Sequence, residues 1–246
     1  MIKLFILGSA NAIPSADREN TYFLIENGEK SILIDCGPGS FLKLQNMKIP
    51  IDSVSDLIVT HFHPDHVSGF PLLVMDWWLL GRKAPLTIHG LEYTLDRIKT
   101  LMELHNWKNW PNFFPVHFHP LPEKYATVIE DQEIQINSAV VQHLIPTIGL
   151  RFTFNNQTIG YSCDTEPCEG VLQLGRDADI FIHESAGAAP GHSTAKQCGA
   201  DARLAGAKEL FLIHFPEEAD KEQLIADARL EFPGEVTLAK DMMVFE

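Results

Sequence analysis

The chain has 246 residues, 45% of them hydrophobic, which is enough to bury a sizeable core and excludes an intrinsically disordered protein. Its 33 acidic residues outnumber its 19 basic residues, and the resulting net charge of −14 disfavours long-range attraction of a nucleic-acid backbone. No stretch approaches the roughly 18 to 20 apolar residues of a membrane span, and Met1 leads directly into a strand-like segment, so we expect a cytoplasmic protein with no membrane partner.

Short apolar runs separated by Gly, Pro, Asn or Asp indicate strands and turns in the first part of the chain, and alternating strands and helices follow. The predicted strands are 2–7, 21–25, 31–35, 56–60 and 86–89, and the predicted helices are 66–80 and 91–106. The next segment, 107–122, is dense in aromatic residues and prolines, so we expect an irregular loop there. Its aromatic residues are expected in the core, with a pocket lid or a subunit contact as the alternative.

The same order of elements begins again near residue 126. The predicted strands are 126–129, 133–136, 139–145, 149–154, 157–162, 179–183 and 209–214, and the predicted helices are 167–175, 194–205 and 220–230. Two such halves, 1–122 and 123–246, predict a single α/β domain over 1–246. We expect two mixed sheets face to face with helices outside, which is a four-layer αββα sandwich.

The four cysteines are too scattered for a disulfide framework, and none forms a CxxC pair. They are Cys36, Cys163, Cys168 and Cys198. We therefore expect reduced thiols, most of them buried. Cys163 and Cys168 lie close to Asp164 in the sequence, but burial is the favoured interpretation over a role as metal ligands.

Four potential metal ligands follow the strand 56–60 within six residues, in the sequence His61-Phe62-His63-Pro64-Asp65-His66. In an extended segment His61 and His63 point to the same side and can bind one ion together. Pro64 ends the strand and turns Asp65 and His66 toward a second ion. Imidazole and carboxylate donors suit Zn²⁺, with Mn²⁺ and Fe²⁺ as alternatives.

This motif resembles the signature of the metallo-β-lactamase superfamily, and the resemblance extends over nearly the whole chain. It implies two divalent transition metal ions per chain. His143 would be the third ligand of the first ion, Asp164 the bridging carboxylate, and His214 the last ligand of the second ion. Asp35 would support the ligand loop through hydrogen bonds. Taken singly, a histidine at a strand end is more often structural, so the prediction depends on the whole set.

The other histidines match no motif of the family. His117 and His119 resemble a chelating pair, but they have no neighbouring acid or cysteine in the sequence and fall in the predicted loop 107–122. A surface or pocket-rim role is therefore the favoured interpretation for this pair. His89 and His105 are likewise placed outside the metal site.

The segments His183-Glu184-Ser185 and Gly191-His192-Ser193-Thr194 resemble the ribonuclease Z branch and its short phosphodiesterase relatives. The resemblance implies that His192 binds the scissile phosphate and protonates the leaving oxygen, a role that suits a histidine of near-neutral pKa. Glu184 either orients His192 or satisfies a buried network. Ser193 and Thr194 are also residue types that favour the start of a helix.

Two features depart from ribonuclease Z. The basic arm that grips tRNA in that family has no counterpart, because only residues 144–163 separate His143 from Asp164. The N-terminal loop 14–20 keeps Arg18 as a supporting site residue but has Ala16 where the family has lysine. Both changes remove phosphate contacts and favour a small substrate over tRNA.

The sequence therefore predicts a metal-dependent phosphodiesterase in which Asp65 orients the water nucleophile and His192 serves the leaving group. The alternatives are a ribonuclease Z that processes tRNA 3′ ends, a hydrolase of another ester or thioester, or a redox member of the superfamily. A non-catalytic metal-binding protein would have no need of His192. A homodimer stays open, since two copies could assemble a basic surface.

Overall fold

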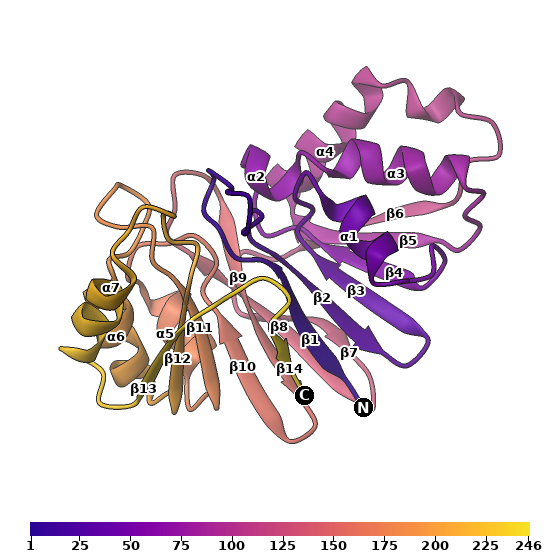
Figure 1. The fold of residues 1–246 in the computed structure, drawn as a ribbon. Helices are drawn as coiled ribbons and strands as arrows, with labels where there is room; N and C mark the ends of the chain where they lie inside the picture. The colour runs from indigo at the N-terminus through magenta and orange to yellow at the C-terminus, as the bar shows by residue number, and fades with distance from the viewer.

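The structure is a computed structural model that describes residues 1–246. Two seven-stranded mixed sheets pack face to face, and helices cover the outer side of each (Figure 1). The predicted four-layer αββα sandwich is confirmed. None of the helices has the length and apolar character needed to cross a membrane.

The first sheet has the strand order β14-β1-β2-β3-β4-β5-β6. Its strands β14, β1, β2 and β3 are antiparallel neighbours, whereas β3 to β6 run parallel. The strands are β1 (Lys3–Gly8), β2 (Tyr22–Asn27), β3 (Lys30–Ile34), β4 (Val54–Ile58), β5 (Leu86–Leu91), β6 (Val116–Leu121) and β14 (Val244–Phe245).

The second sheet has the order β13-β12-β11-β10-β9-β8-β7 and repeats this division. Strands β7 to β10 are antiparallel, and β10 to β13 are parallel. The strands are β7 (Ala126–Glu130), β8 (Ile134–Val141), β9 (Thr147–Phe154), β10 (Gln157–Tyr161), β11 (Ile180–Glu184), β12 (Glu209–Ile213) and β13 (Glu235–Leu238).

Helices flank the parallel part of each sheet. The bounds are α1 (Ser40–Asn46), α2 (Pro64–Val67), α3 (Phe70–Leu79), α4 (Glu92–Leu104), the 3-10 turn η1 (Trp107–Asn109), α5 (Glu169–Gly175), α6 (Ala195–Ala205) and α7 (Lys221–Arg229). Figure 1 shows α3 and α4 outside the first sheet and α6 and α7 outside the second.

Three apolar cores hold these layers together. The core between the sheets includes Phe23 and Tyr161, whose rings meet edge to face at 4.6 Å. A second core lies between the first sheet and its helices, and a third lies between the second sheet and α5, α6 and α7. The inner strands of both sheets thus bury both faces, which explains the continuous apolar runs in the sequence.

The structure corrects the predicted loop 107–122. Residues Val116–Leu121 form β6, the edge strand of the first sheet, paired in parallel with β5. Pro120 lies within this strand, and proline is tolerated there because an edge strand has one unpaired side. The predicted helix 66–80 is two helices, α2 and α3, interrupted at Ser68 and Gly69.

Helix α1 and strands β13 and β14 were not predicted. Between α2 and α3, Gly69 lies so close to the Gly37 carbonyl oxygen that a Cβ at this position would be 2.0 Å from it, so the packing requires glycine here. The four cysteines are free, and three of them are buried, as predicted.

Candidate metal centre

The predicted ligands lie in loops that follow the carboxyl ends of β4, β8, β10 and β12. The carboxyl ends of the parallel strands in each sheet meet at one edge, and the two sheets face each other, so these loops converge. Helix α2, which carries Asp65 and His66, lies between the two halves in Figure 1. Sequence segments far apart thus meet in one cluster of histidine and aspartate side chains.

The first group of donors contains His61, His63, His143 and Asp164. His63 Nδ1 lies 3.1 Å from His61 Nε2 and 3.0 Å from His143 Nε2. His61 Nε2 lies 3.9 Å from Asp164 Oδ2. Three imidazole nitrogens and one carboxylate oxygen within such distances form a donor set typical of a transition metal ion.

The second group contains Asp65, His66, Asp164 and His214. His66 Nε2 lies 3.4 Å from Asp65 Oδ2 and 3.7 Å from Asp164 Oδ1. His214 Nε2 lies 3.3 Å from Asp164 Oδ2. Asp164 belongs to both groups, as expected for a bridging carboxylate.

Two buried atoms of this cluster show that the residues fit a metal ion. His66 Nε2 and Asp164 Oδ1 are buried and have no hydrogen-bond partner. A buried polar atom without a partner is costly, and an ion between these two atoms would satisfy both. The clusters of histidine and aspartate therefore suit divalent metal ions.

The protonation of the first group also favours metal binding. Burial lowers the pKa values of His61, His63 and His143, and the neighbouring histidines add to this effect. Neutral imidazoles have the lone pairs that a metal ion requires. At His66, burial opposes the charged ring, but Asp164, Asp35 and Asp65 outweigh burial and raise its pKa.

A second layer of hydrogen bonds fixes the orientation of the ligands. Asp35 Oδ2 accepts a hydrogen bond from His66 Nδ1 at 2.7 Å, and both Asp35 oxygens accept from Thr60. His143 Nδ1 donates to the Gly191 carbonyl oxygen at 2.7 Å. These bonds leave the opposite ring nitrogens, Nε2 of both histidines, free to bind metal.

Asp35 and His214 share an unusual backbone conformation, with φ values of 61° and 58°. Left-handed conformations are uncommon for residues other than glycine and cluster at functional sites. Asp35 directly follows β3, and His214 directly follows β12. The two turns direct these side chains into the centre.

His192 lies outside both donor groups but next to them. Its ring centroid is 5.0 Å from that of His143, and its ring stacks on His214 at 6.0 Å. His192 Nδ1 donates to Glu184 Oε1 at 3.0 Å, and this bond raises the pKa of His192. His192 therefore lies beside two of the predicted ligands and forms a hydrogen bond with Glu184.

Glu184 is fully buried and has every oxygen engaged. Its Oε1 also accepts from the backbone N–H groups of Thr165 and Ser193, and its Oε2 accepts from that of Ala186. Both interpretations of Glu184 in the sequence, orientation of His192 and satisfaction of a buried network, therefore describe its contacts.

Arg18 does not face the donor groups. Its guanidinium stacks on the Phe215 ring at 3.8 Å and donates to the carbonyl oxygens of Ser9 and Phe215. It also forms an ion pair with Glu217 at 3.2 Å. Arg18 therefore holds the N-terminal loop against the residue that follows His214.

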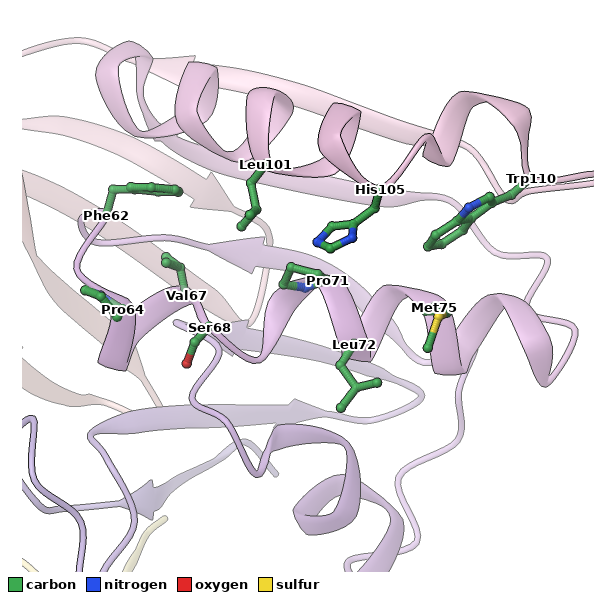
Figure 2. Close-up of a pocket in the computed structure, with 10 residues that line it drawn as sticks. All are labelled: Phe62, Pro64, Val67, Ser68, Pro71, Leu72, Met75, Leu101, His105 and Trp110. Carbon is green, nitrogen blue, oxygen red and sulfur yellow. The ribbon is translucent and has the colours of Figure 1, made fainter.

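An apolar groove of about 640 Å³ opens beside the ligand loop. Figure 2 shows Phe62 at one end, Leu101 and His105 on one side, Pro71 and Met75 on the other, and Trp110 at the far end. Its remaining lining residues are Pro64, Val67, Ser68 and Leu72. The groove has no lysine or arginine, and sequence reasoning missed it because its residues come from α2, α3, α4 and the loop residues beside them.

The chain is similar in sequence to ribonuclease Z enzymes and in fold to several solved structures. A ribonuclease Z of Methanosarcina acetivorans is 26% identical over 307 aligned positions, which cover 100% of this chain and 98% of that enzyme. The crystal structure of the metallo-β-lactamase fold protein YhfI of Bacillus subtilis matches with a TM-score of 0.84 and 23% identity, over 99% of this chain and 98% of that one. The short form of human tRNase Z matches with a TM-score of 0.78 and 25% identity, over the same shares.

The predicted class of metal-dependent hydrolase is thereby confirmed: the relatives include ribonuclease Z enzymes and a probable metallo-hydrolase, and the chain has the metallo-β-lactamase fold. As predicted, it has no long arm, since β9 and β10 fill the interval between His143 and Asp164. The model of the family described as Anti-Pycsar protein Apyc1 matches residues 2–236. The chain belongs to this Anti-Pycsar protein Apyc1 family.

Proposed function

We propose that the chain is a phosphodiesterase that uses two divalent transition metal ions, in the first place Zn²⁺, to hydrolyse a small phosphodiester. The observation that carries this proposal is the position of His192, a protonatable ring held against the donor groups without belonging to them. A metal centre with a purely structural role has no use for such a residue.

Seven residues would hold the two ions. They are His61, His63 and His143 on one side, Asp65, His66 and His214 on the other, and Asp164 between them. When bound, such ions lower the pKa of water and neutralise charge on the phosphoryl oxygens. Asp65, which is only partly buried, is placed to orient the attacking water.

His192 supplies the proton for the leaving group. Its Nδ1 is committed to Glu184, so Nε2 is the atom that donates to the leaving oxygen. The hydrogen bond from His192 to Glu184 favours the protonated ring, which is the form a general acid needs. Departure of an alkoxide or phenoxide from a diester benefits from this proton.

The groove beside the ligand loop supports a small organic diester. Its volume of about 640 Å³ is that of a typical small-molecule site, and its lining suits an uncharged aromatic or aliphatic substituent on the phosphate. A folded tRNA draws its affinity from many lysine and arginine contacts. The net charge of −14 and the lack of an arm leave few such contacts.

Processing of tRNA 3′ ends is the second candidate, because proteins named ribonuclease Z align over the full chain. A thioesterase is a third, since the same fold supports several chemistries. The three differ in substrate, so a direct comparison separates them.

The test compares initial rates on bis(p-nitrophenyl) phosphate, a cyclic nucleotide, a precursor tRNA and a thioester, at matched salt and metal. We expect cleavage of one or both small diesters and little release of the tRNA 3′ trailer. Efficient trailer removal at physiological salt would make the enzyme a ribonuclease Z, and a preference for the thioester would assign it to another branch. His192→Ala, measured in parallel, shows whether the rates come from this site.

A further inference from the structure

A second set of histidines lies on the strands β4, β5 and β6, apart from the loops of the metal centre. His89 on β5 pairs with His119 on β6 in the parallel register. Two residues earlier on β5, Thr87 pairs with Asp56 on β4 and with His117 on β6. One acid and three histidines therefore occupy two cross-strand rows, with the row of Ile88 between them.

These four polar side chains share one face of the sheet. Their sequence neighbours Leu57, Ile88 and Phe118 contribute to the core beneath α3 and α4. Successive side chains of a strand point to opposite faces, so the acid and the histidines face away from those helices. In the sequence, His117 and His119 have no neighbouring acid and fall in the predicted loop 107–122. In the fold, β4 supplies the acid, Asp56.

The contacts within the set fix the tautomer of His89. Its Nε2 lies 2.7 Å from Asp56 Oδ1, and its Nδ1 lies 3.1 Å from His119 Nδ1. Asp56 accepts the hydrogen on His89 Nε2, so the lone pair of His89 Nδ1 faces His119.

This geometry matches that of histidines bound to a metal ion. A ligand histidine usually donates its other ring N–H to a carboxylate or a carbonyl oxygen. With Zn–N bonds of about 2.0–2.1 Å, two ligand nitrogens at a tetrahedral ion lie about 3.3 Å apart. The separation of 3.1 Å between the Nδ1 atoms of His89 and His119 is close to this value.

We infer that His89 and His119 form a peripheral binding site for one divalent transition metal ion such as Zn²⁺, in which Asp56 holds His89 in the ligand tautomer. Imidazole donors select borderline ions such as zinc, copper and nickel over Ca²⁺ and Mg²⁺. His119 is exposed, so an ion can reach it from solvent, whereas His89 is buried. The site shares no ligand with the centre around Asp164 and does not depend on the proposed function.

The test uses full-length protein in which the main centre, formed by the two donor groups that share Asp164, is already loaded with zinc. Calorimetric titration with Zn²⁺ is expected to show one further ion per chain, and diffraction at the zinc absorption edge is expected to place it between His89 and His119. His119→Ala is the primary variant because an exposed residue tolerates replacement, and it is expected to abolish the further ion. Asp56→Asn is expected to weaken it about 10- to 100-fold.

The matched control is His105→Ala, an exposed histidine outside the set, which is expected to bind the further ion like the wild type. Phosphodiester turnover in His119→Ala is expected to equal that of the wild type, which separates this site from the main centre. Two results would overturn the inference: no anomalous peak at His89 and His119 in excess Zn²⁺, or an unchanged titration of His119→Ala. The pair would then be joined by a hydrogen bond alone.

Discussion

Glu184 Oε1 accepts a hydrogen bond from His192 Nδ1 across 3.0 Å, and the carboxylate is fully buried while the imidazole is partly exposed. Glu184 is therefore held in place by the surrounding protein, whereas His192 is accessible to a substrate. Because three backbone N–H groups also hold Glu184, its orientation is set by the fold rather than by His192.

Glu184→Gln should change the pH dependence of turnover. The hydrogen bond to Glu184 and the negative charge of its carboxylate raise the pKa of His192, and the neutral amide of glutamine removes that charge, so the pKa falls. A general acid acts while it is protonated, and activity disappears as the pH rises through its pKa. The alkaline limb of the kcat profile should therefore move to lower pH in the variant. Glu169→Gln at the start of α5 is the control, and a limb that stays in place would contradict the assignment.

His192→Ala should retain the metal content of the wild type and lose about 10²- to 10⁴-fold in kcat, the range for removal of a general acid. The reason is that His192 lies outside both donor groups. Metal analysis and kinetics on the same preparation check this prediction. Loss of metal together with activity would make His192 a ligand.

Asp164→Ala should reduce the metal content of the main centre further than His63→Ala does. Asp164 belongs to both donor groups, whereas His63 belongs to one. Elemental analysis of metal-replete protein should give close to two ions at this centre in the wild type. One ion or fewer in folded wild-type protein would falsify the two-ion proposal.

Leu101→Ala should raise KM for an aryl phosphodiester by about three- to tenfold with little change in kcat, since removal of a few methylene groups from an apolar pocket weakens binding by this order. Leu101 lines the groove between α3 and α4 (Figure 2). Leu42→Ala on α1, where the side chain is exposed and outside the groove, is the control. An unchanged KM would show that the substrate avoids the groove.

Arg82→Met should destabilise the fold by about 3 kcal/mol or more, because buried carbonyl groups that lose their donor are costly. Arg82 is 1% exposed and donates to the carbonyl oxygens of Ile51, Val54, Ala84 and Pro85. Burial lowers its pKa to about 10, so the guanidinium stays charged at neutral pH. Urea unfolding measures the change, with Arg97→Met on the exposed face of α4 expected to cost under about 0.5 kcal/mol.

The sequence alone was sufficient to predict the sandwich, because apolar runs of strand length predicted both sheets. The resemblance to the metallo-β-lactamase superfamily implied the candidate ligands His143, Asp164 and His214, which the fold brings into one cluster. Such runs can be recognised in a sequence because a strand that is buried on both faces consists mostly of consecutive apolar residues.

Features that depend on contacts between distant segments needed the tertiary structure. Strand β6 contains Pro120 and reads as a loop, because its place at the sheet edge is not encoded locally. The groove takes residues from three helices and the loops beside them, and Asp56, His89 and His119 come together only when β4, β5 and β6 align in register. Side chains distant in sequence become neighbours through strand pairing and packing, which local patterns do not specify.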